Sequence, residues 1–141
     1  MAEQLNLFGP TLNVTARLKA AMREALHKSD FSREQIVDKM RMLAKADGLG
    51  GGRGSTISLP NLDAWCSETK PNLIPVNLLT LFCHVTKDLG PLKVLAHPLQ
   101  GTVVGRREQK LLAWAEIEVQ AKHLAKKRKR ILSEIGDMED E

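Results

Sequence analysis

The chain has 141 residues, of which 43% are apolar and only 4% aromatic, with no tyrosine. This length supports one domain of ordinary size with an appendage, and a composition rich in Leu, Ala, Lys, Arg and Glu favours helices. No run approaches the ~18 apolar residues of a membrane span, and residues 1–10 lack the basic region and apolar core of a signal peptide. The cysteines Cys66 and Cys83 make no disulfide framework, so we expect a protein of the reducing cytoplasm without a membrane partner.

The charges are unevenly distributed along the chain. Residues 1–105 contain 12 Lys and Arg against 9 Asp and Glu, residues 106–130 contain 9 against 3, and residues 131–141 contain none against 5. The net charges of these segments are therefore +3, +6 and −5. A basic segment beside an acidic tail indicates a polyanionic partner, although a solvated helix with a charged tip has the same composition.

Residues 1–12 are predicted to be a tail that Gly9 and Pro10 keep apart from the first helix. Within the tail, the sequence QLNLF resembles the peptide with which bacterial proteins dock on the DNA-polymerase sliding clamp. The resemblance implies that Leu7 and Phe8 are apolar anchors next to Leu5, and that Gln4 forms a hydrogen bond at the rim of the clamp's pocket. The alternative is that these apolar residues cover the helical core.

Two helices are predicted next. Residues 14–28 repeat apolar side chains every three or four positions, which gives one apolar face. In the second helix, which Gly48 ends, Ser32 precedes Gln35 by three residues, the spacing of a capping box. Five glycines then fall within residues 48–54, which predicts a mobile connector bearing Arg53 and not a nucleotide loop, because no Gly-Lys-Ser/Thr ending follows.

Three more helices complete a predicted five-helix domain over residues 13–100. Ser58 caps the third helix and Pro60 lies in its first turn, while the fourth spans residues 75–87. A short fifth helix covers residues 91–96, and residues 101–105 are extended. We therefore expect an all-α protein.

A long basic helix is predicted over residues 106–136, with an acidic tail at residues 137–141. At ~1.5 Å per residue it is ~45 Å long. Alternating spacings of three and four residues give a coiled-coil-like seam, which predicts self-association more strongly than folding back on the domain. The seam consists of Trp114, Ile117, Ala121, Leu124, Ile131 and Ile135, with Arg128 as its one basic interruption.

Residues 14–96 resemble the lambda-repressor-like helix-turn-helix superfamily, including its prophage-encoded regulators. In that pattern a helix of the Ser-x-Glu-x-Ile/Leu-Ala type precedes a recognition helix that ends in Trp, a short polar stretch and Pro, and a Leu-Leu-x-Leu helix follows. The matching residues are Ser32, Gln35, Ile36, Leu62, Trp65, Pro71, Leu78, Leu79 and Leu81. The Gly-rich insertion departs from the pattern because the superfamily's turn is short.

The resemblance implies a DNA-binding surface in which the second helix meets phosphate and the third meets base edges. The expected contacts are to phosphate from Arg33, Gln35 and Lys70, to base edges from Ser58, Asn61 and Ala64, and to the backbone or minor groove from Arg53, Ser55 and Thr56. We also expect non-specific DNA contact from the basic stretch at residues 122–130.

No enzyme, cofactor or metal site is predicted, because Cys66, Cys83, His84 and His97 lack the close spacing of zinc ligands. The hypothesis from these patterns is a phage-type transcriptional regulator that binds double-stranded DNA as a dimer or higher oligomer. The competing interpretations are a generic helical bundle and a replication or assembly adaptor that binds protein partners.

Overall fold

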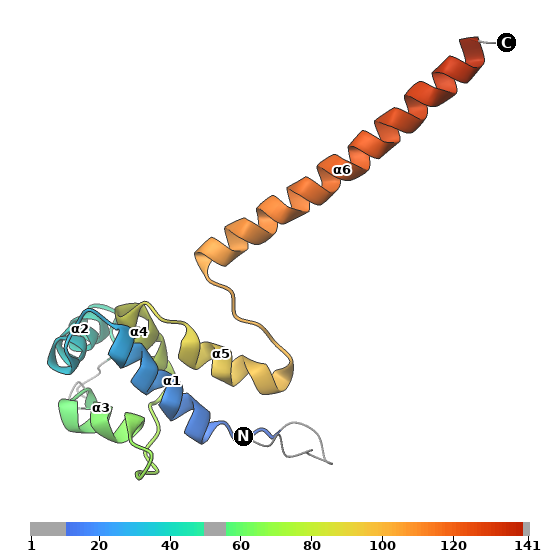
Figure 1. Ribbon diagram of the computed structural model, residues 1–141. Coiled ribbons are helices and arrows are strands. Elements are labelled where there is room, and N and C mark those ends of the chain that lie inside the picture. The colour runs from blue at the N-terminus through green and yellow to red at the C-terminus, as the bar shows by residue number, and fades with distance from the viewer. Residues whose placement is uncertain (1–10, 50–55, 140–141) are drawn as a thin grey trace. The chain divides into compact units, whose positions relative to one another are not determined.

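The computed structural model describes residues 11–49 and 56–139, and all regular structure within these residues is helical. The elements are α1 (Thr15–Lys28), α2 (Arg33–Ala46), α3 (Leu59–Cys66), α4 (Val76–Thr86), α5 (Gly90–Ala96), the 3-10 turn η2 (His97–Leu99) and α6 (Arg106–Glu139) (Figure 1). The chain divides into two compact units, Met1–Val103 and Val104–Glu141. The predicted all-α class with a long C-terminal helix is confirmed.

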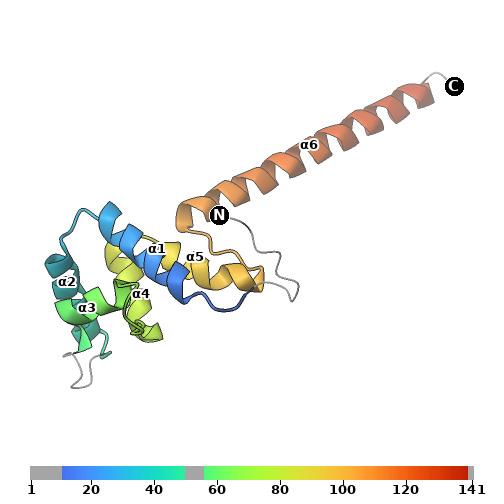
Figure 2. The same cartoon turned by 60° about the horizontal axis from the view of Figure 1, so that its bottom comes forward.

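Helix α4 is the central element of the first unit. Seven of its eleven residues are buried, because its sequence VNLLTLFCHVT places apolar side chains on nearly every face. α2 and α5 both pack against α4, α1 packs against α5, and α3 contacts both α1 and α2 (Figures 1 and 2). Met22, Ile36, Met40, Leu62 and Phe82 fill the core with almost no exposed surface.

The helix ends follow their local sequence. Gln35 N donates to Ser32 Oγ at 3.2 Å and Ser32 N donates to Gln35 Oε1 at 2.9 Å, so the predicted capping box is confirmed. Ser58 Oγ likewise accepts from Asn61 N at the start of α3. Gly48 follows α2 with a φ of +68°, a conformation that glycine adopts without steric cost.

Some boundaries differ from the prediction. The fifth helix begins at Gly90 and continues into η2. Residues 101–105 lie outside any helix or strand, which does not contradict the predicted extended segment. Helix α6 runs to Glu139, so Asp137 and Glu139 are helical although we predicted an acidic tail from residue 137.

The second unit is α6, a single helix of 34 residues, which makes it ~51 Å long at ~1.5 Å per residue. None of its residues is buried, and large apolar side chains such as Trp114 are well exposed along it. Within residues 11–49 and 56–139, no helix is both long enough and apolar enough to cross a membrane.

Candidate nucleic-acid interface

Two cations of α1 hold the C-terminal end of α3. Lys19 is buried, and its Nζ donates to the carbonyl oxygens of Ala64 at 3.0 Å, Trp65 at 3.1 Å and Asn72 at 2.5 Å. One turn later, Arg23 donates to the Cys66 carbonyl at 2.6 Å and forms an ion pair of 2.8 Å with Glu68. Both cations therefore lie at the negative end of the α3 dipole and satisfy its last carbonyls.

The sequence prediction missed this pair. Burial lowers the pKa of the Lys19 amino group, the Cys66 thiol opposes this effect, and Arg23 lowers the pKa further. The three hydrogens of the ammonium group nevertheless have three carbonyl acceptors. A lysine next to the apolar positions Leu18 and Met22 was the available signal, but its acceptors lie 45–53 residues away in the chain.

The exposed face of α3 is electrostatically neutralised. Arg33, at the start of α2, donates from Nη1 to Asp63 Oδ1, and both side chains are about half exposed. The cation predicted to meet phosphate is therefore engaged by a carboxylate of the helix that was predicted to read bases. An exposed ion pair of this kind is weak, so phosphate can compete for Arg33.

The polar groups predicted to contact DNA at the starts of α2 and α3 are used within the domain. The Gln35 side chain completes the capping box, and the Ser58 hydroxyl caps α3. Asn61 Nδ2 donates to the Thr56 carbonyl at 2.7 Å, which fixes the segment that leads into α3. These bonds account for the residue types without a base contact.

Ala64 corrects the predicted base-reading face. Its side chain is buried at 8% exposure, because α3 turns Leu62, Trp65 and Cys66 inward and Ala64 lies beside them against α1. A side chain in that position cannot reach a base edge in the major groove, so Ala64 is removed from the site.

Of the remaining predicted contacts, Lys70 is exposed in the segment that follows α3, and Thr56 is exposed before it. Two further predicted DNA contacts lie outside the described residues, namely Arg53 and Ser55. The predicted N-terminal peptide also lies outside them, with its residues Gln4, Leu5, Leu7 and Phe8. The chain after the Gly-rich insertion is anchored by Ile57, which is buried and whose carbonyl accepts from Arg41 Nε at 2.6 Å.

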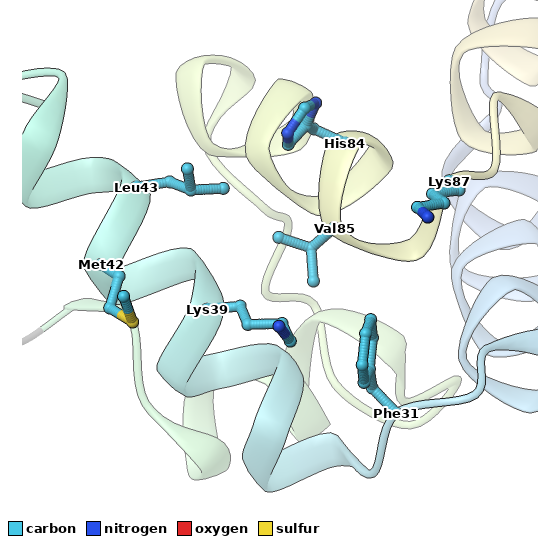
Figure 3. A pocket seen from close by; sticks show the side chains of 7 residues that line it. All are labelled: Phe31, Lys39, Met42, Leu43, His84, Val85 and Lys87. Atoms are coloured by element: carbon cyan, nitrogen blue, oxygen red, sulfur yellow. The ribbon is translucent and has the colours of Figure 1, made fainter.

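A shallow pocket of about 360 Å³ lies between α2 and the end of α4 (Figure 3). Phe31, Met42, Leu43 and Val85 give it apolar walls, and Lys39 Nζ stands 4.4 Å from the centroid of the Phe31 ring. None of the predicted DNA contacts lines this pocket. Among the described residues, no group of three or more His, Cys, Asp or Glu side chains could hold a metal ion.

The densest cationic surface lies on α6. Residues 122–130 contain six Lys and Arg, all exposed, and none of the six forms an ion pair with another described residue. At 100° per residue, four of them point away from the apolar seam, which leaves that face open to a polyanion. These four cations are Lys122, Lys126, Lys129 and Arg130.

The seam residues share one face of α6, as the spacing predicted. Trp114, Ile117 and Leu124 are each 62% exposed, and Ile131 and Ile135 are 44% and 48% exposed. A stripe of large apolar side chains this open to water is a candidate surface for binding another protein chain. None of the protein families, curated proteins and solved structures compared with the chain matches it.

Proposed function

We propose that the chain is a non-enzymatic DNA-binding protein that acts as a homo-oligomer and contacts DNA mainly through phosphate. The observation that carries the proposal is the exposed, unpaired basic stretch at residues 122–130 of α6. Lys and Arg side chains on one helical face supply the sequence-independent part of DNA affinity by displacing counterions. Arg33 and Lys70 are secondary phosphate contacts of the first unit.

A regulator of transcription in the cytoplasm is the form of this function that the helix-turn-helix resemblance of residues 14–96 implies. In this proposal α3 contributes little base readout, since Ser58 and Asn61 are held in local hydrogen bonds and Asp63 is paired with Arg33. Sequence selectivity would then come from the segments around Thr56, not from Ala64.

The test is the affinity for a fluorescently labelled duplex, measured by anisotropy from ~50 to ~300 mM salt. The variant that replaces Lys122, Lys126, Lys129 and Arg130 by Gln should bind more weakly, and its slope of log affinity against log salt should be shallower by about 3 to 4. The matched control replaces Arg17, Lys45, Lys87 and Lys93 by Gln, which removes the same charge from α1–α5 and should leave the slope nearly unchanged.

Two results would contradict the proposal. One is an absence of binding by the unsubstituted chain at ~50 mM salt, and the other is equal weakening in both variants. The first result would favour the alternative of a replication or assembly adaptor, in which the domain and the seam bind proteins.

A further inference from the structure

The seam of α6 is exposed to water, and the charges of the helix follow a regular pattern along its length. Its charges fall into four blocks of alternating sign, each of which occupies a separate length of the helix. Residues 106–110 contain three cations and one acid, residues 116–118 contain two acids, residues 122–130 contain six cations, and residues 134–139 contain three acids.

From this pattern we infer that α6 pairs with α6 of a second copy of the chain in antiparallel orientation. The inference rests on the self-association within the proposed function and adds the direction and register of the pair. The midpoint lies between Lys122 and His123, so the acidic block at 116–118 faces the basic residues 127–129 of the second copy. The acidic block at 134–139 likewise faces the basic N-terminal turns of α6.

Side-chain size and charge in the seam favour the same register. Trp114 faces Ile131 of the second copy, and Ala121 faces Leu124, so the largest and the smallest residues of the seam each meet a residue of intermediate size. Arg128 faces Ile117, whose neighbours Glu116 and Glu118 can accept its charge.

A parallel pair in register lacks these features. It would set Arg128 against Arg128 and the whole basic stretch 122–130 against itself, and it would place a thin Ala121 layer near a wide Trp114 layer. Like charges at facing positions destabilise a coiled coil, and uneven layers leave gaps in its core.

Antiparallel registers shifted by one heptad are also worse. A shift in one direction brings Lys126 opposite Lys126 of the second copy, at the centre of both basic stretches. A shift in the other direction sets Lys110 against Arg128 and leaves Ile135 beyond the start of the partner helix at Arg106.

The antiparallel pair also brings the cationic stretches of the two copies to neighbouring levels along the helix axis. The four outward cations of one chain and the four of the other lie on either side of the midpoint, along ~24 Å of paired helix at ~1.5 Å per residue. Because both sets point away from the shared seam, the pair presents a basic surface on each of its two opposite sides, with the acidic C-terminal blocks at its two ends.

Distance measurements between spin labels on the full-length chain test the orientation. A label at Gln109→Cys should report ~40 Å between the two copies, because the equivalent residues lie near opposite ends of the paired helices. A label at His123→Cys, next to the midpoint, should report less than ~20 Å. The unsubstituted chain, exposed to the same reagent, controls for labelling of Cys66 and Cys83, which are both buried.

A short distance at position 109 in a dimer would overturn the antiparallel pair and leave self-association standing. A monomer by light scattering would overturn both. A complex of three or more chains would overturn the pair but not the self-association.

Charge reversal provides a second test with an internal control. Glu116→Lys with Glu118→Lys should weaken dimerisation about 10-fold, as should Lys127→Glu with Lys129→Glu, because each double change sets like charges opposite each other. When all four changes are made in one chain, opposite charges again face each other, but only in the antiparallel register. The quadruple variant should therefore dimerise within about 3-fold of the original chain. A quadruple variant as weak as the double variants would contradict the register.

Discussion

Lys19 gives α3 its place in the fold, because a single ammonium group joins two carbonyls of its last turn to that of Asn72. Lys19→Met keeps an apolar stem of similar length but removes the donor to all three carbonyls, of which that of Ala64 keeps only a long bond of 3.4 Å from Ser67 N. We expect the free energy of unfolding to fall by about 2–4 kcal/mol, since each unsatisfied buried group costs about 1–3 kcal/mol. Urea unfolding followed by circular dichroism measures the change.

Arg17→Met on the exposed side of the same helix is the matched control for Lys19 and should stay within about 0.5 kcal/mol of the original chain. Equal stability of the two variants would mean that the carbonyls of Ala64, Trp65 and Asn72 do not need the Lys19 ammonium.

Cys83 predicts a pH dependence of stability. Burial, and next the nearby Asp88 carboxylate, raise the pKa of its thiol from 9.0 to about 11, against a smaller opposing effect of the Leu92 backbone. As pH rises from about 9 to about 11, the unfolded chain loses the thiol proton while the folded chain keeps it, so the free energy of unfolding should decrease.

The comparison for Cys83 is with Cys83→Ala, which removes the thiol but keeps a small apolar side chain. Urea midpoints across this range should fall more steeply for the original chain than for the variant. Parallel pH profiles of the two chains would contradict the raised pKa.

At the scale of elements, the helices were largely predictable and their rotations were not. The Ser32–Gln35 capping box and the Ser58 cap are local hydrogen bonds, so their spacing in the sequence was sufficient to locate helix starts. Whether Ala64 faces solvent or core depends on the rotation of α3 about its own axis. This rotation is fixed by hydrogen bonds from Lys19 and Arg23, which belong to a helix distant in the sequence.

In the candidate site, too, features within one helix were predictable and contacts between helices were not. The basic stretch at 122–130 and the seam were evident from spacing along one continuous helix, because their geometry depends only on helical periodicity. The pairing of Arg33 with Asp63 joins two helices across the Gly-rich insertion, and no local pattern reports such a contact.

A chain that ends at Gly105 should fold as a monomer. The buried core lies between Leu18 and Val85 with α5 packed against it, and α6 contributes no buried residue. We expect cooperative thermal unfolding by circular dichroism and a monomeric mass by light scattering, against an oligomer for the full chain. An oligomer of residues 1–105 would place self-association outside α6.

The seam itself is tested by replacing Leu124 and Ile131 together by Ala in the full chain. Each truncation removes buried apolar area from the pair, so association should weaken by a few kcal/mol in total, about 2–4 kcal/mol. The control is Lys122→Ala with Lys126→Ala on the outward face, at positions that do not lie opposite an acidic block, and it should leave the mass unchanged. Equal association of the two variants would contradict the seam.

At the scale of the whole molecule, the two units have different roles in the proposed function. The first unit is a small helical domain whose potential DNA-reading helix is occupied by internal hydrogen bonds and an ion pair. The second is a helix whose exposed seam is the proposed contact for a partner chain and whose basic stretch at residues 122–130 is the proposed contact for phosphate. Association through the stripe would give the complex two cationic faces, one on each side of the helix pair, through which it can contact DNA.

The central claim is that α6, and not α3, supplies most of the DNA affinity. It is tested most directly by comparing the full chain with residues 1–105 on the same labelled duplex at ~50 mM salt. The account predicts that loss of α6 weakens binding at least about 100-fold, because the basic stretch and its second copy are removed together. Binding by residues 1–105 within about 3-fold of the full chain would contradict the claim and assign DNA recognition to the helix-turn-helix-like unit.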